Sequence, residues 1–140
     1  MLVSDREGEV MAGSGTAHMR NTVDSVLTVR DLTVEFKIGK DKVVKAVSGL
    51  SFDVVKGETL AVVGESGCGK STAGRTVLKL YDPTSGSIKF EGEEISGYSP
   101  RKMKPLRTQM QMIFQDPQAS LNPRQTVGAI ISASYEVHKI

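Results

Sequence analysis

The chain has 140 residues, of which 39% are hydrophobic and 24% charged, and its formal net charge is +2. These values are typical of one modest globular domain. No apolar run of about 18 residues occurs, and the amino-terminal segment lacks the apolar core of a secretory signal, so we expect no direct membrane insertion. The charges are dispersed, which argues against a nucleic-acid partner. The single cysteine, Cys68, excludes a disulfide within the chain.

Residues 1–25 are rich in Gly, Ser, Thr and charge and show no periodicity, so we expect a disordered leader there. Residues 26–140 are expected to fold. Alternation of apolar and polar side chains predicts a small antiparallel sheet in the first part of this region. Its expected strands cover residues 26–30, 32–36, 43–47 and 50–55, with a turn at Gly39–Lys42.

The next segment combines an apolar run, Thr59–Val63, with the sequence GESGCGKS over Gly64–Ser71. It matches G-x-x-x-x-G-K-[ST], a phosphate-binding loop (P-loop) between a strand and a helix. Its glycines let successive N–H groups point inward, and the helix adds the positive end of its dipole. We expect a nucleotide polyphosphate to bind Gly64, Glu65, Ser66, Gly67, Cys68, Gly69, Lys70 and Ser71.

Two residues of the loop have specific expected roles. Lys70 would reach the β- and γ-phosphates as a point charge, and the hydroxyl of Ser71 would ligate Mg²⁺. The alternative is a glycine-rich turn that matches the pattern by chance. The following helix is expected to bury a face made of Ala73, Val77 and Leu80 and to end at Asp82–Gly86.

The second half of the chain contains shorter predicted elements. A strand is expected at residues 87–90, and Ser99 with Pro100 can start a short helix. Residues 110–114 read as a buried strand that carries Gln115 at its carboxyl end, where open α/β sheets commonly place ligand-contacting residues. Finally, Thr126 is expected to cap a helix with an apolar stripe of Val127, Ile130 and Ile131.

A family resemblance appears at Gln115. The P-loop, the sequence MIFQDP over Met112–Pro117 and the continuation QASLNPR over Gln118–Arg124 resemble the ATP-binding subunits of ABC transporters, in the oligopeptide/dipeptide importer subfamily. A P-loop alone would leave kinases, GTPases and other ATPases open. The resemblance covers residues 26–140 and implies an α/β P-loop NTPase fold. An antiparallel β-subdomain and a partial P-loop core are expected, truncated in the helical subdomain.

The resemblance also implies roles for single residues. Gln115 would be the Q-loop glutamine, which positions water or Mg²⁺, and Lys70 would act with it in catalysis. Phe36 stands where the family carries an aromatic residue, often Tyr, that stacks on adenine; Phe keeps the π-face that stacking needs. Packing within the sheet is the alternative for Phe36, and a surface polar residue is the alternative for Gln115. Thr72 would donate to the α-phosphate.

By the same resemblance, the chain would be part of a subunit that couples ATP binding and hydrolysis to uptake of peptides or a similar solute. ATP and Mg²⁺ would be its cofactors. Its partners would be membrane permease subunits, contacted through Gln115 to Arg124, and a second ATP-binding subunit, identical or different. The expected location is cytoplasmic, peripheral on the inner face of the cell membrane.

Several family elements have no counterpart in the printed sequence. They are the Walker B aspartate, the adjacent glutamate, the Leu-Ser-Gly-Gly-Gln signature and the switch histidine. We therefore expect these 140 residues alone to bind ATP weakly or not at all and to hydrolyse none. Two alternatives stay open: a catalytically inactive fragment that at most binds nucleotide, and a soluble P-loop ATPase of another family. Residues Phe114–Pro117 and Ser120–Arg124 speak against the second.

Overall fold

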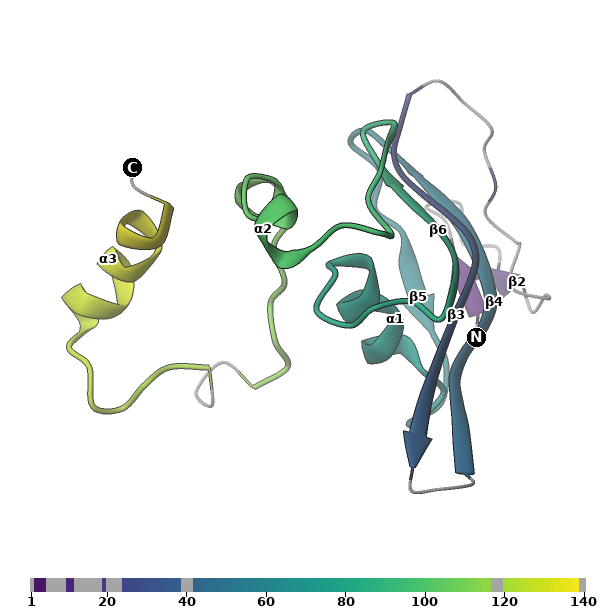
Figure 1. Ribbon diagram of the computed structural model, residues 1–140, viewed down its shortest axis with the longest axis horizontal. Coiled ribbons are helices and arrows are strands. Elements are labelled where there is room, and N and C mark those ends of the chain that lie inside the picture. Colours follow the sequence, from purple (N-terminus) through teal and green to yellow (C-terminus); the bar gives the residue numbers. More distant parts are fainter. Residues whose placement is uncertain are drawn as a thin grey trace. The chain divides into compact units, whose positions relative to one another are not determined.

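The computed structural model describes residues 2–4, 10–11, 19, 24–38, 42–116 and 120–138. They belong to two compact units, Met1–Met103 and Lys104–Ile140 (Figure 1). The first contains the sheets and the P-loop, and the second contains Gln115. In the described part of the chain, no helix is both long and apolar enough to cross a membrane.

The first unit is organised around a long hairpin of β3 (Ser25–Ile38) and β4 (Lys42–Val55). These strands belong to a four-stranded antiparallel sheet in the order β4-β3-β6-β7, with β6 at Ser85–Phe90 and β7 at Glu93–Glu94. The predicted antiparallel sheet is confirmed, although the four short strands expected before the P-loop are two long ones. Most of the expected turn at Gly39–Lys42 lies outside the described residues.

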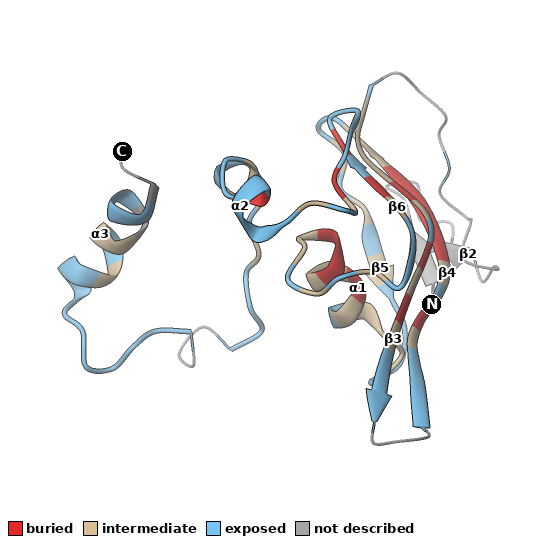
Figure 2. Cartoon of the chain, in the orientation of Figure 1, coloured by how far each residue is buried: buried red, intermediate tan, exposed pale blue. Residues whose placement is uncertain are grey.

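The core of this unit lies between the sheet and α1 (Lys70–Val77), which packs on one face of β3 and β4 (Figures 1 and 2). The buried apolar side chains are Val29, Leu32, Val34, Val47, Leu50, Phe52, Ala73, Val77, Ile88, Phe90, Ile95 and Met103. Ala73 and Val77 thus form the buried helix face that their spacing predicts. This burial supplies the main apolar contribution to the stability of the unit.

Leu80 does not extend that buried face, contrary to expectation, and is exposed. The helix stops at Val77 because Lys79 adopts a left-handed conformation with a φ of 53°. The N–H of Leu80 then donates to the carbonyl of Arg75 at 2.8 Å, and the N–H of Lys79 donates to that of Thr76 at 2.9 Å. This is a Schellman-type helix end, which turns the chain before Leu80 can face the core.

A second, three-stranded sheet has the order β2-β1-β5, with β1 at Leu2–Ser4, β2 at Val10–Met11 and β5 at Ala61–Val63. Both pairings are antiparallel. Strand β5 is the predicted strand before the P-loop. Strands β1 and β2 fall within residues 1–25, where we expected a disordered leader; most of the rest of that segment lies outside the described residues.

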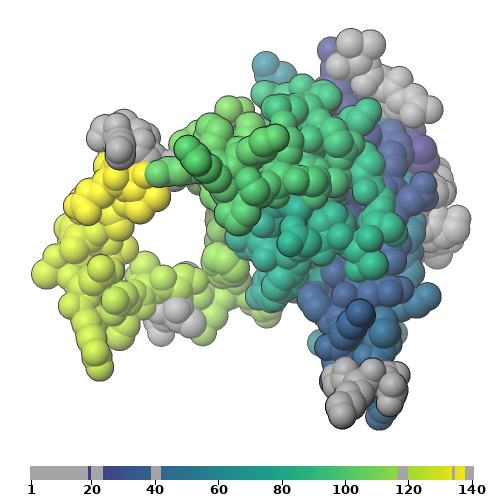
Figure 3. Space-filling model, viewed as in Figure 1, coloured from purple at the N-terminus to yellow at the C-terminus, as the bar shows by residue number. Residues whose placement is uncertain are grey.

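The β3–β4 pairing contains a local irregularity that matters for the P-loop. Val34 pairs with Val47 and Glu35 pairs with Lys45, which leaves Ala46 as an extra residue in β4. An extra residue of this kind is a β-bulge, which bends the strand and redirects its peptide groups. The bulge lies in the half of β4 that begins at Lys42, and Figure 3 shows the described residues of this end of the β3–β4 hairpin projecting from the first unit.

Beyond β7, the short helix α2 (Pro100–Met103) begins at the predicted residue and buries Met103. The second unit contains a 3-10 turn at Leu106–Thr108 and α3 (Val127–His138). Its predicted cap is confirmed, because the N–H of Ala129 donates to Oγ1 of Thr126 at 3.3 Å.

Residues 110–114 do not form the buried strand that we expected. They are irregular, and the side chain of Ile113 is 94% exposed. A buried strand needs hydrogen-bonded neighbours and covered faces, and no strand of the described residues pairs with this segment. Side chains of the expected apolar stripe on α3 are exposed as well, and that of Val127 is 73% exposed.

Candidate phosphate-binding site

The P-loop connects β5 to α1 through residues 64–69 and depends on glycines with positive φ. Gly67 has a φ of 82° and Gly69 a φ of 95°, values at which side chains other than that of glycine are strained. A Cβ on Gly69 would overlap the carbonyl oxygen of Ala46 and lie 3.2 Å from its carbonyl carbon. The β4 bulge therefore presses a peptide group against the start of α1, and only glycine fits between them.

The side chain of Lys70 turns back across the loop instead of pointing into solvent. Its Nζ donates to the carbonyl oxygens of Gly64 at 2.6 Å and Glu65 at 2.7 Å, and it lies 3.5 Å from Sγ of Cys68. An ammonium group has three N–H donors, so these contacts hold the charge at the mouth of the loop. Residues 64–67 are exposed, which leaves this positive charge accessible.

The first turn of α1 offers further donors to an anion. The N–H of Ala73 donates to the carbonyl of Gly69 at 2.8 Å, but those of Lys70, Ser71 and Thr72 donate to no acceptor among the described residues. Neither an acidic residue in the first turn nor a side-chain cap competes for these groups. Unpaired N–H groups at a helix start, next to a lysine ammonium, fit a phosphate group.

The metal-binding capacity of this site is small. Ser71 is exposed, and its hydroxyl has no hydrogen-bond partner in the described part of the chain. Among the described residues, no group of three or more His, Cys, Asp or Glu side chains could hold a metal ion. One hydroxyl fits a cation such as Mg²⁺ that is held mainly by phosphate oxygens and water.

Phe36 lies near the end of β3, opposite Val44 of β4, and its side chain is 38% exposed. Its ring packs edge-to-face with Tyr81, with ring centroids 5.4 Å apart and an interplanar angle of 83°. Phe36 is therefore compatible with both expectations. Its contact with a neighbouring ring fits a packing role, and its exposed surface fits stacking on adenine. The sequence indicated nothing for Tyr81, since no spacing pattern links it to a strand residue so far away in the chain.

Gln115 belongs to the second unit, and the P-loop residues belong to the first. It is exposed and follows the irregular segment 110–114. Just beyond it, Oγ of Ser120 donates to the carbonyl of Asp116 at 2.9 Å, and the N–H of Arg124 donates to Oδ1 of Asn122 at 3.0 Å. Pro117, Gln118 and Ala119 lie outside the described residues.

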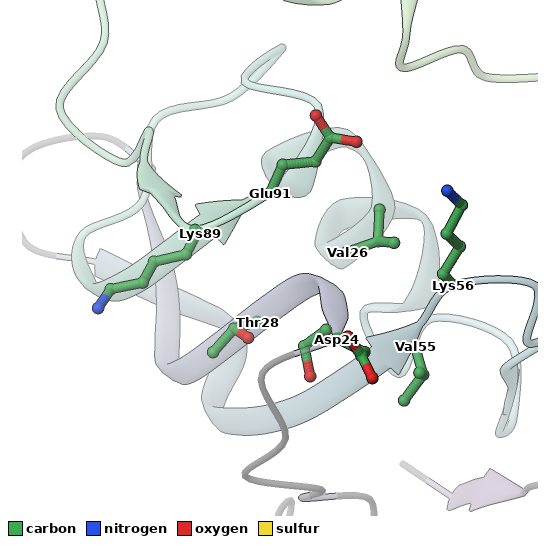
Figure 4. A pocket seen from close by; sticks show the side chains of 9 residues that line it. Asp24, Val26, Thr28, Val55, Lys56, Lys89 and Glu91 are labelled. Atoms are coloured by element: carbon green, nitrogen blue, oxygen red, sulfur yellow. The ribbon is translucent and has the colours of Figure 1, made fainter.

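Described residues of the first unit line two concave regions that bear on the site. One, of about 510 Å³, adjoins Lys70 and Ser71 and is lined mostly by apolar side chains of the sheet and α1, among them Leu50, Phe52 and Val77. The other, of about 660 Å³, lies where β3, β4 and β6 meet the turns at Lys56 and Glu91 (Figure 4).

The charged groups of the second region do not form a site. Figure 4 shows the Lys89 side chain pointing away from those of Lys56 and Glu91, so the three charged groups do not meet at a common point. Backbone hydrogen bonds also connect the residues that line this region: the N–H of Lys56 donates to the carbonyl of Asp24, and the N–H of Glu91 donates to that of Val26. The P-loop carries both a lysine ammonium and unpaired amides at a helix start, so the P-loop is the candidate site.

Comparison with known proteins shows which family this chain resembles. The ABC transporter family model matches residues 47–139. The oligopeptide transport ATP-binding protein AppF of Bacillus subtilis (strain 168) is 51% identical over 124 residues, which cover 84% of this chain and 38% of that protein. The di/tripeptide transport ATP-binding protein DppF of Pseudomonas aeruginosa (strain UCBPP-PA14) is 48% identical over 111 residues, covering 76% and 34%. The chain therefore spans little more than a third of these relatives.

Solved structures show the same fold. The dimeric bacterial ABC transporter cassette MJ0796 matches with a TM-score of 0.69 and 20% identity over 80% of this chain and 47% of that one. CbiO1 of Clostridium perfringens, part of the ABC transporter complex cbiONQ, matches with a TM-score of 0.60 and 26% identity over 81% and 48%. The expected P-loop NTPase fold with an antiparallel β-subdomain is confirmed. The chain belongs to the ABC transporter family.

Proposed function

We propose that this chain is the nucleotide-binding part of an importer subunit that uses ATP to drive uptake of peptides. The observation that carries the proposal is the convergence of three features at the start of α1. These are the Lys70 ammonium held over the loop, the unpaired amides of residues 70–72 and the close approach of Gly69 to Ala46. The names of the relatives support peptides as the cargo.

The residues of the loop have distinct tasks in this proposal. The free N–H groups of Lys70, Ser71 and Thr72 bind phosphate oxygens, and the Lys70 ammonium neutralises their charge. The carbonyl contacts of Lys70 hold its Nζ in place before ligand binds, which reduces the entropy lost on binding. The other residues of the loop, Gly64, Glu65, Ser66, Gly67, Cys68 and Gly69, shape it around the phosphates.

Two further groups complete the proposed nucleotide site. The hydroxyl of Ser71 and the side-chain oxygen of Gln115 are proposed Mg²⁺ ligands, and Gln115 also orients water. Bound MgATP would supply the transferable phosphoryl group and its charge compensation. Phe36 offers an exposed aromatic surface for the adenine base, because stacking needs only a π-face.

The partners are also part of the proposal. A second ATP-binding subunit is supported by the dimeric cassette among the matching structures. Membrane permease subunits are proposed to contact Gln115 to Arg124. Leu121 within this range and Phe114 just before it are exposed. The complete subunit would then lie on the inner face of the cell membrane. Hydrolysis coupled to transport is proposed for that complete subunit.

Equilibrium dialysis of the full chain with labelled ATP and Mg²⁺ tests the nucleotide site. We expect weak, saturable binding that Lys70→Ala reduces at least about tenfold, because a charge-assisted phosphate contact is lost. Lys89→Ala is the matched control, since Lys89 is an exposed lysine of β6 that faces the other concave region. Equal binding by all three chains, or no binding by the unsubstituted chain, would contradict the proposal.

A further inference from the structure

A chain of side-chain contacts joins α1, the helix that starts at the P-loop, to Phe36 of β3. Arg75 is part of α1, the helix that starts at the P-loop. Its Nη1 donates to the hydroxyl of Tyr81 at 3.3 Å, and its Cζ lies 5.9 Å from the centre of the Tyr81 ring. The Tyr81 ring in turn contacts Phe36 edge-to-face.

The backbone around Tyr81 is fixed to β3, the strand that carries Phe36. The N–H of Thr84 donates to the carbonyl of Thr33 at 2.8 Å, and the N–H of Glu35 donates to Oγ1 of Thr84 at 2.9 Å. These bonds attach the turn after α1 to the part of β3 next to Phe36. Tyr81 is therefore held on both sides, by its turn and by Arg75.

Phe36 keeps exposed surface beside this contact. It lies in the exposed end of the hairpin, where Ile38, Val43 and Val44 are exposed as well. In an edge-to-face pair, Tyr81 leaves at least one face of the Phe36 ring uncovered. The contact thus restricts how the ring can rotate and still permits a base to stack on it.

We propose that Tyr81 is a positioning residue that holds the Phe36 ring in the orientation needed to stack on the purine base of the nucleotide. This inference rests on the proposed function. Tyr81 touches neither the phosphates nor the base; it acts through Phe36, and Arg75 orients it from the P-loop helix. Removal of the Tyr81 ring should therefore weaken recognition of the base and leave phosphate recognition unchanged.

The nucleotide test compares two probes on the full chain, ATP and inorganic tripolyphosphate, each with Mg²⁺. We expect Tyr81→Leu to weaken ATP binding about fivefold, the effect of losing one well-oriented aromatic contact. Tripolyphosphate binding should not change. Phe36→Leu should show the same selectivity, and the double variant should bind ATP no more weakly than Phe36→Leu, because the two residues act as one unit. Tyr81→Phe should keep most of the affinity.

Tyr98→Leu is the matched control. Tyr98 is another half-buried tyrosine of the first unit and has its own cation contact, with Nζ of Lys102 5.3 Å from its ring centre. We expect it to change neither affinity. The positioning role would be overturned if Tyr81→Leu weakened the binding of ATP and of tripolyphosphate equally. It would also be overturned if the effects of Tyr81→Leu and Phe36→Leu on ATP affinity added up in the double variant.

A second measurement does not require nucleotide. NMR of the chain with labelled phenylalanine rings reports the environment and averaging of Phe36. Tyr81→Leu should shift and sharpen the Phe36 ring signals through faster ring motion, and Tyr98→Leu should leave them unchanged. Unchanged Phe36 signals in Tyr81→Leu would overturn the inference. A responsive Phe36 ring in a chain that binds no ATP would instead contradict the proposed function.

Discussion

The peptide carbonyl of Ala46 lies directly against Gly69, in the space that any side chain at position 69 would occupy. Ala46 is the extra residue of the β4 bulge, and Gly69 is the residue before the first turn of α1. The P-loop is thus braced by the antiparallel sheet as well as by its own strand and helix.

We expect Gly69→Ala to lower the free energy of unfolding by about 2–4 kcal/mol, because the added Cβ overlaps the Ala46 carbonyl and the residue must keep a positive φ. Nucleotide binding should be lost. Gly92→Ala is the control for strain alone, since Gly92 has a φ of 82° and no atom within 4 Å of an added Cβ. Chemical denaturation of both variants measures the difference, and equal destabilisation would contradict the steric account.

The ion pair between the partly exposed Arg30 and the buried Asp53 supports a second prediction. Nη1 of Arg30 lies 2.7 Å from Oδ1 of Asp53, and Nη2 donates to Oδ2 at 2.8 Å. The Asp53 side chain is only 1% exposed. Arg30→Ala takes the cation away from this buried carboxylate, so we expect a loss of about 2–3 kcal/mol in unfolding free energy.

The control for this prediction is Lys45→Ala, which breaks the exposed pair with Glu35 at 3.6 Å. Exposed ion pairs contribute little, so the expected change is below about 1 kcal/mol. Arg30→Lys should recover only part of the loss, because an ammonium cannot reproduce the two-pronged contact. Denaturant unfolding measures the unfolding free energy of the three variants. An Arg30→Ala chain as stable as Lys45→Ala would show that the ion pair with Asp53 does not contribute.

Glu94 leads to a prediction about acid stability. Burial alone would raise the pKa of its carboxyl group, but hydrogen bonds from Ser87, Ser96 and the N–H groups of Ser96 and Ile88 outweigh burial and lower the pKa below the ordinary 4.5. A lowered pKa in the folded state means that the stabilisation is complete above the unfolded pKa. It is lost as the pH falls through the folded pKa.

We therefore expect the melting temperature of the unsubstituted chain to fall more steeply with acidification below about pH 4.5 than that of Glu94→Gln. The amide retains the shape of the side chain but cannot take up the proton. Thermal unfolding followed by circular dichroism at a series of pH values provides the measurement. Parallel pH profiles for the two chains would show that Glu94 does not contribute.

The amino end of α3 depends on Thr126. Its Oγ1 accepts the N–H of Ala129, and its carbonyl accepts that of Ile130 at 3.0 Å. Thr126→Ala should cost about 1 kcal/mol of local helix stability, and Thr126→Ser should retain most of it. Amide hydrogen exchange at Ala129 and Ile130 reports this directly. Exchange in the serine variant as fast as in the alanine variant would contradict a capping role.

The sequence by itself determined several local elements and the pattern of the P-loop. Apolar alternation predicts an antiparallel sheet, although not that its four expected strands are two long ones. The pattern from Gly64 to Ser71 predicts a strand, a phosphate loop and a helix, and Thr126 predicts a helix start. These features depend on neighbouring residues, so short-range propensities and turn chemistry suffice to find them. The segment 110–114 shows the limit of this reasoning, because an apolar run becomes a strand only when other strands pair with it.

Tertiary structure alone decided which distant residues meet. The bulge at Ala46 that makes glycine necessary at position 69, and the contact between Tyr81 and Phe36, join segments that are remote in sequence. The end of α1 before Leu80 also depends on how Lys79 is held, through Nζ contacts with Asp82 and the carbonyl of Ser96, each at 2.5 Å. Such contacts leave no periodic signal, because they arise only after the sheet and α1 have packed together.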